Sequence, residues 1–166
     1  MSDHYSGVFI IDSTDGMVLA VSDSHHPTEL KMGGGMAVNG ETPEETARRE
    51  GSEELRTQVL AATLVLKETV PGRNGNHVRY FFLADKVVGA LEKGATWEVE
   101  EKSPDGRVVE KLTAKWVPIA EFADRLFYKQ HPAFGAVLAK LGQNPDFYQK
   151  YAQLLDRFPE PENLGL

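Results

Sequence analysis

The chain has 166 residues, a formal net charge of −7 and no cysteine, which excludes disulfides, zinc–thiolate sites and thiol nucleophiles. Its hydrophobic content of 41% and charged content of 26% are ordinary for a globular protein of one domain. No lysine–arginine patch or membrane-length apolar stretch is present. We therefore expect one domain over 1–166, no nucleic-acid partner, no membrane and, without a signal peptide, a cytoplasmic location.

The chain before the first glycine cluster predicts a β-hairpin. Apolar residues 7–11 and 17–21 flank a turn at 13–16, as in two paired strands. His25 and His26 follow in an expected loop, where no third metal ligand lies nearby, so an exposed loop is the simpler interpretation.

The segment Gly33–Thr57 predicts a glycine loop followed by a helix. Thr42 is suited to cap the helix, Pro43 to occupy its first position and Glu45 to close a capping box. The buried face is thin and recurs at helical spacing, through Ala47, Gly51, Leu55 and Val59.

The opposite face of this helix carries a cluster of acids. Glu50, Glu53 and Glu54 stand at i, i+3 and i+4, so a helix of about 3.6 residues per turn places them on one side. Such carboxylates repel one another, and Mg²⁺ removes the penalty because it prefers oxygen ligands. Arg49 is spaced to hold an acid in place. The alternative is a solvated acidic face with ordinary surface ion pairs.

The rest of the chain predicts strands followed by helices. A strong turn at 71–76 separates two apolar runs and indicates a second hairpin, whereas 85–107 is expected to be irregular. The expected elements are strands at 60–70, 77–84 and 111–119, helices at 120–126, 131–141 and 145–158, and a frayed tail at 159–166. This order predicts a mixed α/β or α+β domain with C-terminal helices at about 131–158.

The glycine–helix segment resembles the signature of Nudix hydrolases, G-x5-E-x7-R-E-U-x-E-E-x-G-U, where U is a bulky aliphatic residue. Every charged position of the signature is present at the family's spacing, and the matching residues are Gly35, Glu41, Arg49, Glu50, Glu53 and Glu54. The resemblance implies a mixed sheet sandwiched between helices, over about residues 5–141. It also implies a loop–helix–loop at the signature.

Three positions depart from the signature. Gly51 and Thr57 stand where the family has aliphatic residues, and Arg56 replaces the last glycine. A non-glycine residue in the left-handed conformation costs about 1 kcal/mol or more. We therefore expect a different helix exit, with the helix longer by a turn. The departures concern packing and the exit, and leave the acidic positions intact.

The resemblance implies a metal-dependent pyrophosphohydrolase that uses Mg²⁺ or Mn²⁺. Its small-molecule substrate would be a nucleoside diphosphate linked to another moiety, such as a nucleoside di- or triphosphate, a nucleotide sugar such as ADP-ribose, or a dinucleoside polyphosphate. Many relatives form dimers, so a homodimer is possible. The alternatives are a non-catalytic nucleotide-binding module on the same fold, which would lose the acids, and an acidic interaction domain, which would not need the signature spacing.

The resemblance also assigns roles to residues. Metal ligands would be Glu50, Glu53 and Glu54, with Arg49 orienting the acids. Either Glu53 or Glu110 would act as general base, since some relatives carry a second glutamate before a strand near a tryptophan.

Phosphate and substrate contacts are expected from Gly34, Gly35, Glu41, Arg79 and Trp97. If Glu110 is not the second functional glutamate, Glu100 and Glu101 are the next candidates. The alternative for Glu110 is that it is an ordinary acidic residue of a solvent-exposed loop. The alternative for Trp97 is that its ring packs in the core, and the alternative for Arg79 is that it is a surface cation without a functional role.

Overall fold

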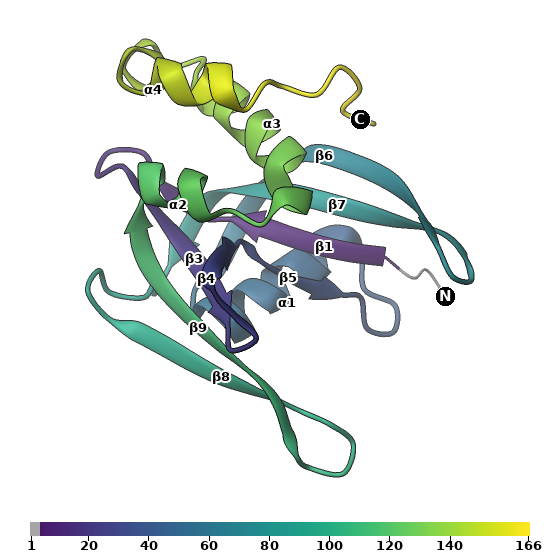
Figure 1. Ribbon diagram of the computed structural model, residues 1–166. Helices are drawn as coiled ribbons and strands as arrows, with labels where there is room; N and C mark the ends of the chain where they lie inside the picture. The colour runs from purple at the N-terminus through teal and green to yellow at the C-terminus, as the bar shows by residue number, and fades with distance from the viewer. Residues whose placement is uncertain (1–3) are drawn as a thin grey trace.

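The structure, a computed structural model, describes residues 4–166, so the first three residues of the expected domain lie outside it. Figure 1 shows the chain. The strands are β1 (His4–Phe9), β2 (Ile11–Asp12), β3 (Met17–Asp23), β4 (His26–Lys31), β5 (Gly33–Met36), β6 (Gln58–Gly72), β7 (Gly75–Val88), β8 (Thr96–Lys102) and β9 (Val108–Pro118). The helices are α1 (Pro43–Leu55), α2 (Ile119–Arg125), α3 (His131–Leu141) and α4 (Pro145–Arg157), with a 3-10 turn η1 (Tyr128–Gln130).

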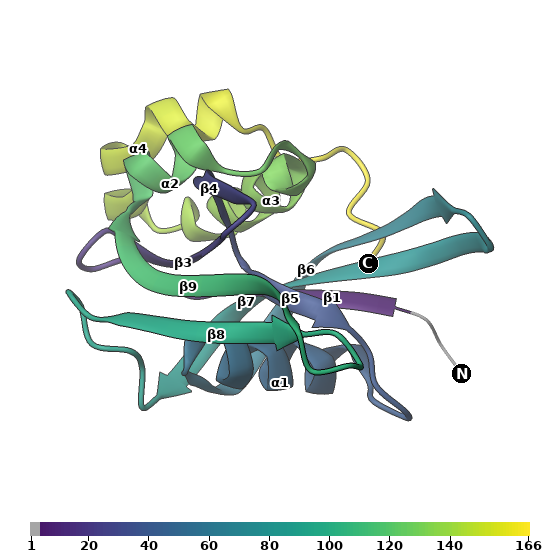
Figure 2. The ribbon, with the colours of Figure 1, turned by 60° about the horizontal axis from the view of Figure 1, so that its bottom comes forward.

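Two sheets form the centre of the molecule. One has the strand order β5-β1-β7-β6 and the other the order β2-β3-β9-β8, with β4 added on β3. Figure 2 shows α1 on one side of the sheets and α2, α3 and α4 on the other. The expected mixed α+β fold, with sheets between helices, is confirmed.

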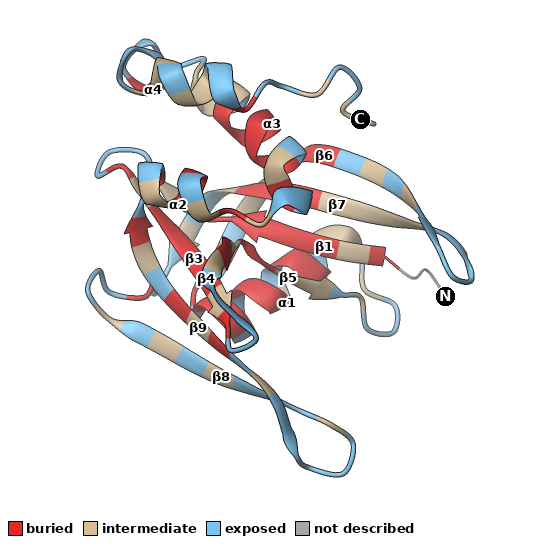
Figure 3. Cartoon of the chain, in the orientation of Figure 1, coloured by how far each residue is buried: buried red, intermediate tan, exposed pale blue. Residues whose placement is uncertain are grey.

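The hydrophobic core has two halves because side chains alternate along each strand. Phe9 belongs to the cluster under α2 and α3, whereas its neighbours Val8 and Ile10 belong to the cluster under α1. Phe81 and Phe82 divide in the same way, and both are buried. Figure 3 shows that the buried residues concentrate where the sheets meet the helices.

The N-terminal hairpin was predicted only in part. β2 and β3 pair antiparallel as expected, but residues 7–9 belong to β1, which pairs parallel with β7 in the other sheet. The loop predicted at the glycines was wrong for Gly33–Met36, which form β5 and pair with β1. Because glycine has no side chain, sequence periodicity cannot reveal such a strand.

The second hairpin, formed by β6 and β7, is confirmed. The irregular region expected at 85–107 was wrong, because β8 lies within it and pairs with β9. Trp97 and Val99 alternate there with exposed Glu98 and Glu100, so one face of the strand is half-buried and the other acidic. In the sequence, the glutamates at 98, 100 and 101 make this segment look uniformly polar, so the alternation was not recognised.

The C-terminal helices lie where they were predicted, as α3 and α4. The tail is not frayed as expected. Its Leu164 carbonyl accepts a hydrogen bond from the Lys67 amide of β6 at 2.9 Å, and the Leu164 side chain packs on the core. In the part of the chain that the structure describes, no helix is long and apolar enough to cross a membrane.

We expect Gly135→Ala to lower stability by about 2 kcal/mol, because a methyl group at this α3 position would collide with the backbone carbonyl of Pro159. A thermal melt compares it with Lys140→Ala, an exposed change on the same helix. An unchanged melting temperature in Gly135→Ala would mean that the tail does not press on α3.

Candidate active site

Helix α1 begins with the predicted capping box. The Thr42 hydroxyl accepts a hydrogen bond from the Glu45 amide at 3.2 Å, and the Glu45 carboxylate accepts one from the Thr42 amide at 2.9 Å. Both bonds satisfy amides that the first turn of a helix leaves unpaired. The buried face is made by Ala47, Gly51 and Leu55, whereas Val59 lies in β6.

The helix ends at Leu55, so the prediction of a longer helix was wrong. Arg56 itself adopts the left-handed conformation, with φ 48° and ψ 40°, and the Thr57 amide bonds to the Gly51 carbonyl at 3.2 Å. The Arg56 guanidinium lies 5.0 Å from the centre of the Trp97 ring, a cation–π contact that stabilises the exit.

The three acids of α1 differ in their surroundings. Glu50 and Glu54 are buried, with exposed fractions of 8% and 9%, whereas the Glu53 side chain is 55% exposed. One Glu54 carboxylate oxygen accepts a hydrogen bond from the Gly34 amide at 2.9 Å. Burial raises the pKa of Glu54 to about 8, helped by repulsion from Glu50 and Glu101. Burial also raises the pKa of Glu50.

The glycines of β5 allow this burial. A methyl group at Gly35 would collide with the Glu50 carboxylate, and one at Gly34 would collide with the Tyr5 hydroxyl. Strand and helix therefore approach closely only because these positions lack side chains. The Gly34 amide, which we expected to face phosphate, donates to Glu54 instead.

Arg49 connects the acidic helix to the preceding loop. It donates to Glu41 at 2.8 Å, to Glu50 and Glu53 at 3.0 Å each, and to the Met36 carbonyl at 2.9 Å. The Arg49 hydrogen bond is the main cause that lowers the pKa of Glu41 to about 2. Arg49 therefore orients the acids, and Glu41 fixes the loop.

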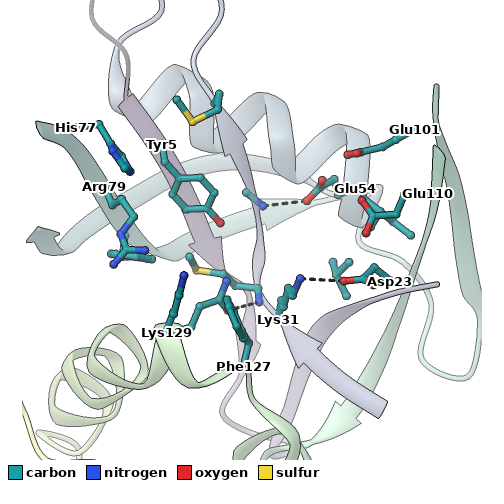
Figure 4. A pocket seen from close by; sticks show the side chains of 17 residues that line it. Tyr5, Asp23, Lys31, Glu54, His77, Arg79, Glu101, Glu110, Phe127 and Lys129 are labelled. Carbon is teal, nitrogen blue, oxygen red and sulfur yellow. Dashed lines mark hydrogen bonds and ion pairs between the residues drawn. The ribbon is translucent and has the colours of Figure 1, made fainter. Parts of the chain in front are cut away.

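A cavity of about 370 Å³ opens beside Glu54. Figure 4 shows that its two side walls differ in charge: Glu101 and Glu110 lie on one, and His77 and Arg79 lie on the other. Gly34, which holds the Glu54 carboxylate, also lines the cavity. The arrangement places carboxylates from α1, β8 and β9 around one opening, although these elements are far apart in sequence.

Glu110 lies in β9 directly opposite Glu101 of β8. Both line the cavity, whereas exposed Glu100 does not, because successive side chains of a strand point to opposite faces. Burial raises the pKa of Glu110, and repulsion from Asp23 and Glu101 adds to this effect. The like charges of the Glu101–Glu110 pair destabilise the two strands unless a cation or proton offsets them.

Some predicted site residues lie outside the cavity. Trp97 does not line it; its indole N–H donates to the Glu53 carbonyl at 3.1 Å, which supports the core-packing alternative. Glu41 and Glu53 are also absent from the cavity wall. Conversely, sequence reasoning missed Tyr5 and Lys129, which line it. No sequence motif marks these two residues, because η1 and β1 meet only in the folded chain.

A profile of the NUDIX domain matches residues 3–139. The chain belongs to the Nudix family. This membership agrees with the signature over Gly35–Glu54, and the domain is that of a Nudix-type hydrolase. α4 and the tail lie beyond the matched Nudix residues.

Solved structures share the Nudix fold. The Escherichia coli ORF135 protein is 15% identical, with a TM-score of 0.60, over 87% of this chain and 94% of that chain. A MutT structure from work on Aliivibrio salmonicida and Vibrio cholerae is 20% identical, with a TM-score of 0.59, over 84% and 99%. The MutT protein of Bacillus halodurans is 18% identical, with a TM-score of 0.51, over 75% and 74%. No curated protein sequence matches with significance.

The chemistry of the Nudix helix fits a divalent cation. Glu50 and Glu54 are buried acids with raised pKa values; Glu50 pairs with Arg49, and Glu54 accepts a hydrogen bond from the Gly34 amide. Glu53 stands on the same helix face. Hard cations prefer such carboxylate oxygens. Within residues 4–166, no three acidic or histidine side chains already converge on one point. Ligation would therefore draw on carboxylates that Arg49 and Gly34 now hold.

In metal-free buffer, we expect stability to fall between about pH 5 and about pH 8 because of Glu54. The folded pKa of about 8 lies above the ordinary value of about 4.3 in an unfolded chain. Between these values the folded chain keeps a proton that the unfolded chain releases, so rising pH favours unfolding. Glu54→Gln removes this contribution, and thermal melts with chelator across the window should show a flatter pH dependence. Equal slopes for both proteins would contradict the assignment.

Proposed function

We propose that the chain is a metal-dependent pyrophosphohydrolase that cleaves a nucleoside diphosphate linked to another moiety. The observation that carries the proposal is the position of Glu54: it is buried, held by the Gly34 amide, and faces a cavity that Glu110 also lines. Nucleoside di- or triphosphates and nucleotide sugars such as ADP-ribose are the substrates we expect. A cavity of about 370 Å³ lies in the size range of small-molecule binding pockets.

Glu50, Glu53 and Glu54 would hold Mg²⁺ or Mn²⁺. When bound, the cation supplies charge neutralisation at the phosphates and makes a water molecule more acidic. Arg49 orients Glu50 and Glu53 through its paired hydrogen bonds. The absence of a lysine–arginine patch from the sequence fits this reaction, because a cation provides positive charge locally.

A glutamate then takes the proton of the attacking water. Of the two candidates, the geometry favours Glu110 over Glu53. Glu110 lines the cavity and burial raises its pKa above the ordinary value of a glutamate, whereas Glu53 is 55% exposed outside the cavity. A carboxylate with a raised pKa is a more effective base near neutral pH. Glu101, opposite Glu110, helps keep that pKa raised.

The test is phosphate release from a panel of nucleotides, with Mg²⁺, with Mn²⁺ and with chelator. The panel contains nucleoside di- and triphosphates, ADP-ribose, nucleotide sugars and a dinucleoside polyphosphate, with a phosphatase coupled where the products are monophosphates. We expect metal-dependent turnover of one class. No turnover of any compound would favour the alternative, a non-catalytic nucleotide-binding module.

The cytoplasmic location, the single domain over 1–166 and the homodimer stay predictions. Gel filtration tests whether the chain forms a homodimer.

A further inference from the structure

The cavity wall opposite Glu101 and Glu110 carries two basic side chains, Arg79 and Lys129, with donors that no acidic group of this wall uses fully. The Lys129 side chain lines the cavity, is exposed to solvent and makes no hydrogen bond or ion pair with any residue between 4 and 166. Arg79 pairs with Glu68 at 3.1 Å, but its Nε is buried without an acceptor. Lys31, by contrast, is neutralised by Asp23 at 2.9 Å. Figure 4 shows Lys129 and Arg79 on the side away from Glu101 and Glu110.

Lys129 is held at this wall by its neighbours in the chain. The adjacent Gln130 is buried, and its side-chain carbonyl accepts a hydrogen bond from the Met32 amide at 3.0 Å. This bond fastens η1 to the junction between β4 and β5. The Lys129 ammonium is therefore presented at the cavity by an anchored turn, which lowers the entropy lost when it binds a ligand.

Because the two walls differ in charge, a ligand that contacts both must carry a different chemical group at each. In the proposed reaction, the diphosphate would lie beside Glu54 and Glu110, where a cation held by α1 would neutralise its charge. A neutral sugar or base against the other wall would take the exposed Lys129 ammonium out of water without an acidic partner among residues 4–166, and would leave the Arg79 Nε without an acceptor. Burying such groups without a partner is costly. An anionic group would instead make charge-assisted hydrogen bonds there. Tyr5, between the walls, adds a hydroxyl donor.

We propose that the wall formed by Arg79 and Lys129 binds an anionic oxygen group carried by the part of the substrate remote from the scissile anhydride. The group is a phosphomonoester or a carboxylate. The substrate is then a nucleoside diphosphate whose attached moiety, or whose nucleoside, bears a further negative charge. This inference rests on the proposed function and narrows its substrate class.

Matched substrate pairs test the preference and separate the two anions. Coenzyme A is compared with 3′-dephospho-coenzyme A for a phosphomonoester, and UDP-glucuronate with UDP-glucose for a carboxylate. In one of the pairs, we expect kcat/KM for the compound with the additional anionic group to exceed that of the compound without it by about tenfold or more, as a charge-assisted contact would provide. High salt should reduce the ratio.

Variants assign the preference to Lys129. Lys129→Met keeps most of the side chain but removes its charge. It should lower kcat/KM about tenfold for the compound with the additional anionic group, with the compound that lacks this group unchanged. Lys129→Arg should restore it. Lys115→Met, an exposed change on β9 outside the cavity, is the matched control. If the kcat/KM ratio between the two members of a substrate pair is the same in wild type and in Lys129→Met, the inference is wrong, whereas the proposed hydrolase activity is unaffected.

A binding measurement separates this inference from the proposed function. Titration calorimetry compares adenosine 3′,5′-bisphosphate with AMP, and needs no turnover. We expect the bisphosphate to bind more tightly to wild type, and the difference to disappear in Lys129→Met. If no substrate is hydrolysed but this difference is found, the proposed function fails and the anion site stands. Equal affinities of both probes for wild type, with no preference in either substrate pair, would remove the site.

Discussion

Glu54→Gln should lower metal-dependent turnover by about three orders of magnitude while the fold persists. Glu54 is buried, lines the cavity, and is held in place by the Gly34 amide. Glutamine keeps the size of the side chain and an oxygen acceptor for that amide, but it removes the charge that a cation requires. Turnover with Mg²⁺ and Mn²⁺ is measured together with circular dichroism, which reports on the fold.

The control for Glu54 is Glu44→Gln on the same helix. Glu44 is half-exposed and pairs with Arg48 at 3.2 Å on the surface, so its loss should leave turnover unchanged. Cation binding, followed by calorimetry, should weaken in Glu54→Gln and persist in Glu44→Gln. Wild-type turnover in Glu54→Gln would show that the acidic face of α1 is a solvated surface.

Glu110→Gln should slow catalysis by a factor of about one hundred or more, with little loss of cation affinity. Glu110 lies in β9 and lines the same cavity as Glu54, and its raised pKa suits it to accept a proton from water. The substitution removes the base without touching the acids of the helix. The measurement is kcat as a function of pH, with cation affinity determined separately.

The control for Glu110 is Glu100→Gln, an exposed acid of β8 that does not line the cavity. It should behave as wild type. The rising limb of the pH profile, which reports the base, should be present in Glu100→Gln and absent from Glu110→Gln. An unchanged rate in Glu110→Gln would move proton transfer to Glu53 on the helix.

Local features of this chain were predictable where neighbours in sequence decide them. The capping box of Thr42 and Glu45, the β6–β7 hairpin and the limits of α3 all depend on short-range geometry. The errors occur where a tertiary contact overrides local preference. Arg56 adopts the left-handed conformation, and its guanidinium lies over the Trp97 ring. The tail is held by its hydrogen bond to β6.

The spacing of the acids on α1 was set by the order of the amino acids, because a helix converts i, i+3 and i+4 into one face. That order also carried the Nudix signature, from Gly35 to Glu54. Both side walls of the cavity required the folded chain. The register of β8 on β9 decides that Glu101 and Glu110 face inward, and the Met32–Gln130 bond brings Lys129 to the cavity. Strand register and packing between distant segments depend on the whole core, so no local pattern contains them.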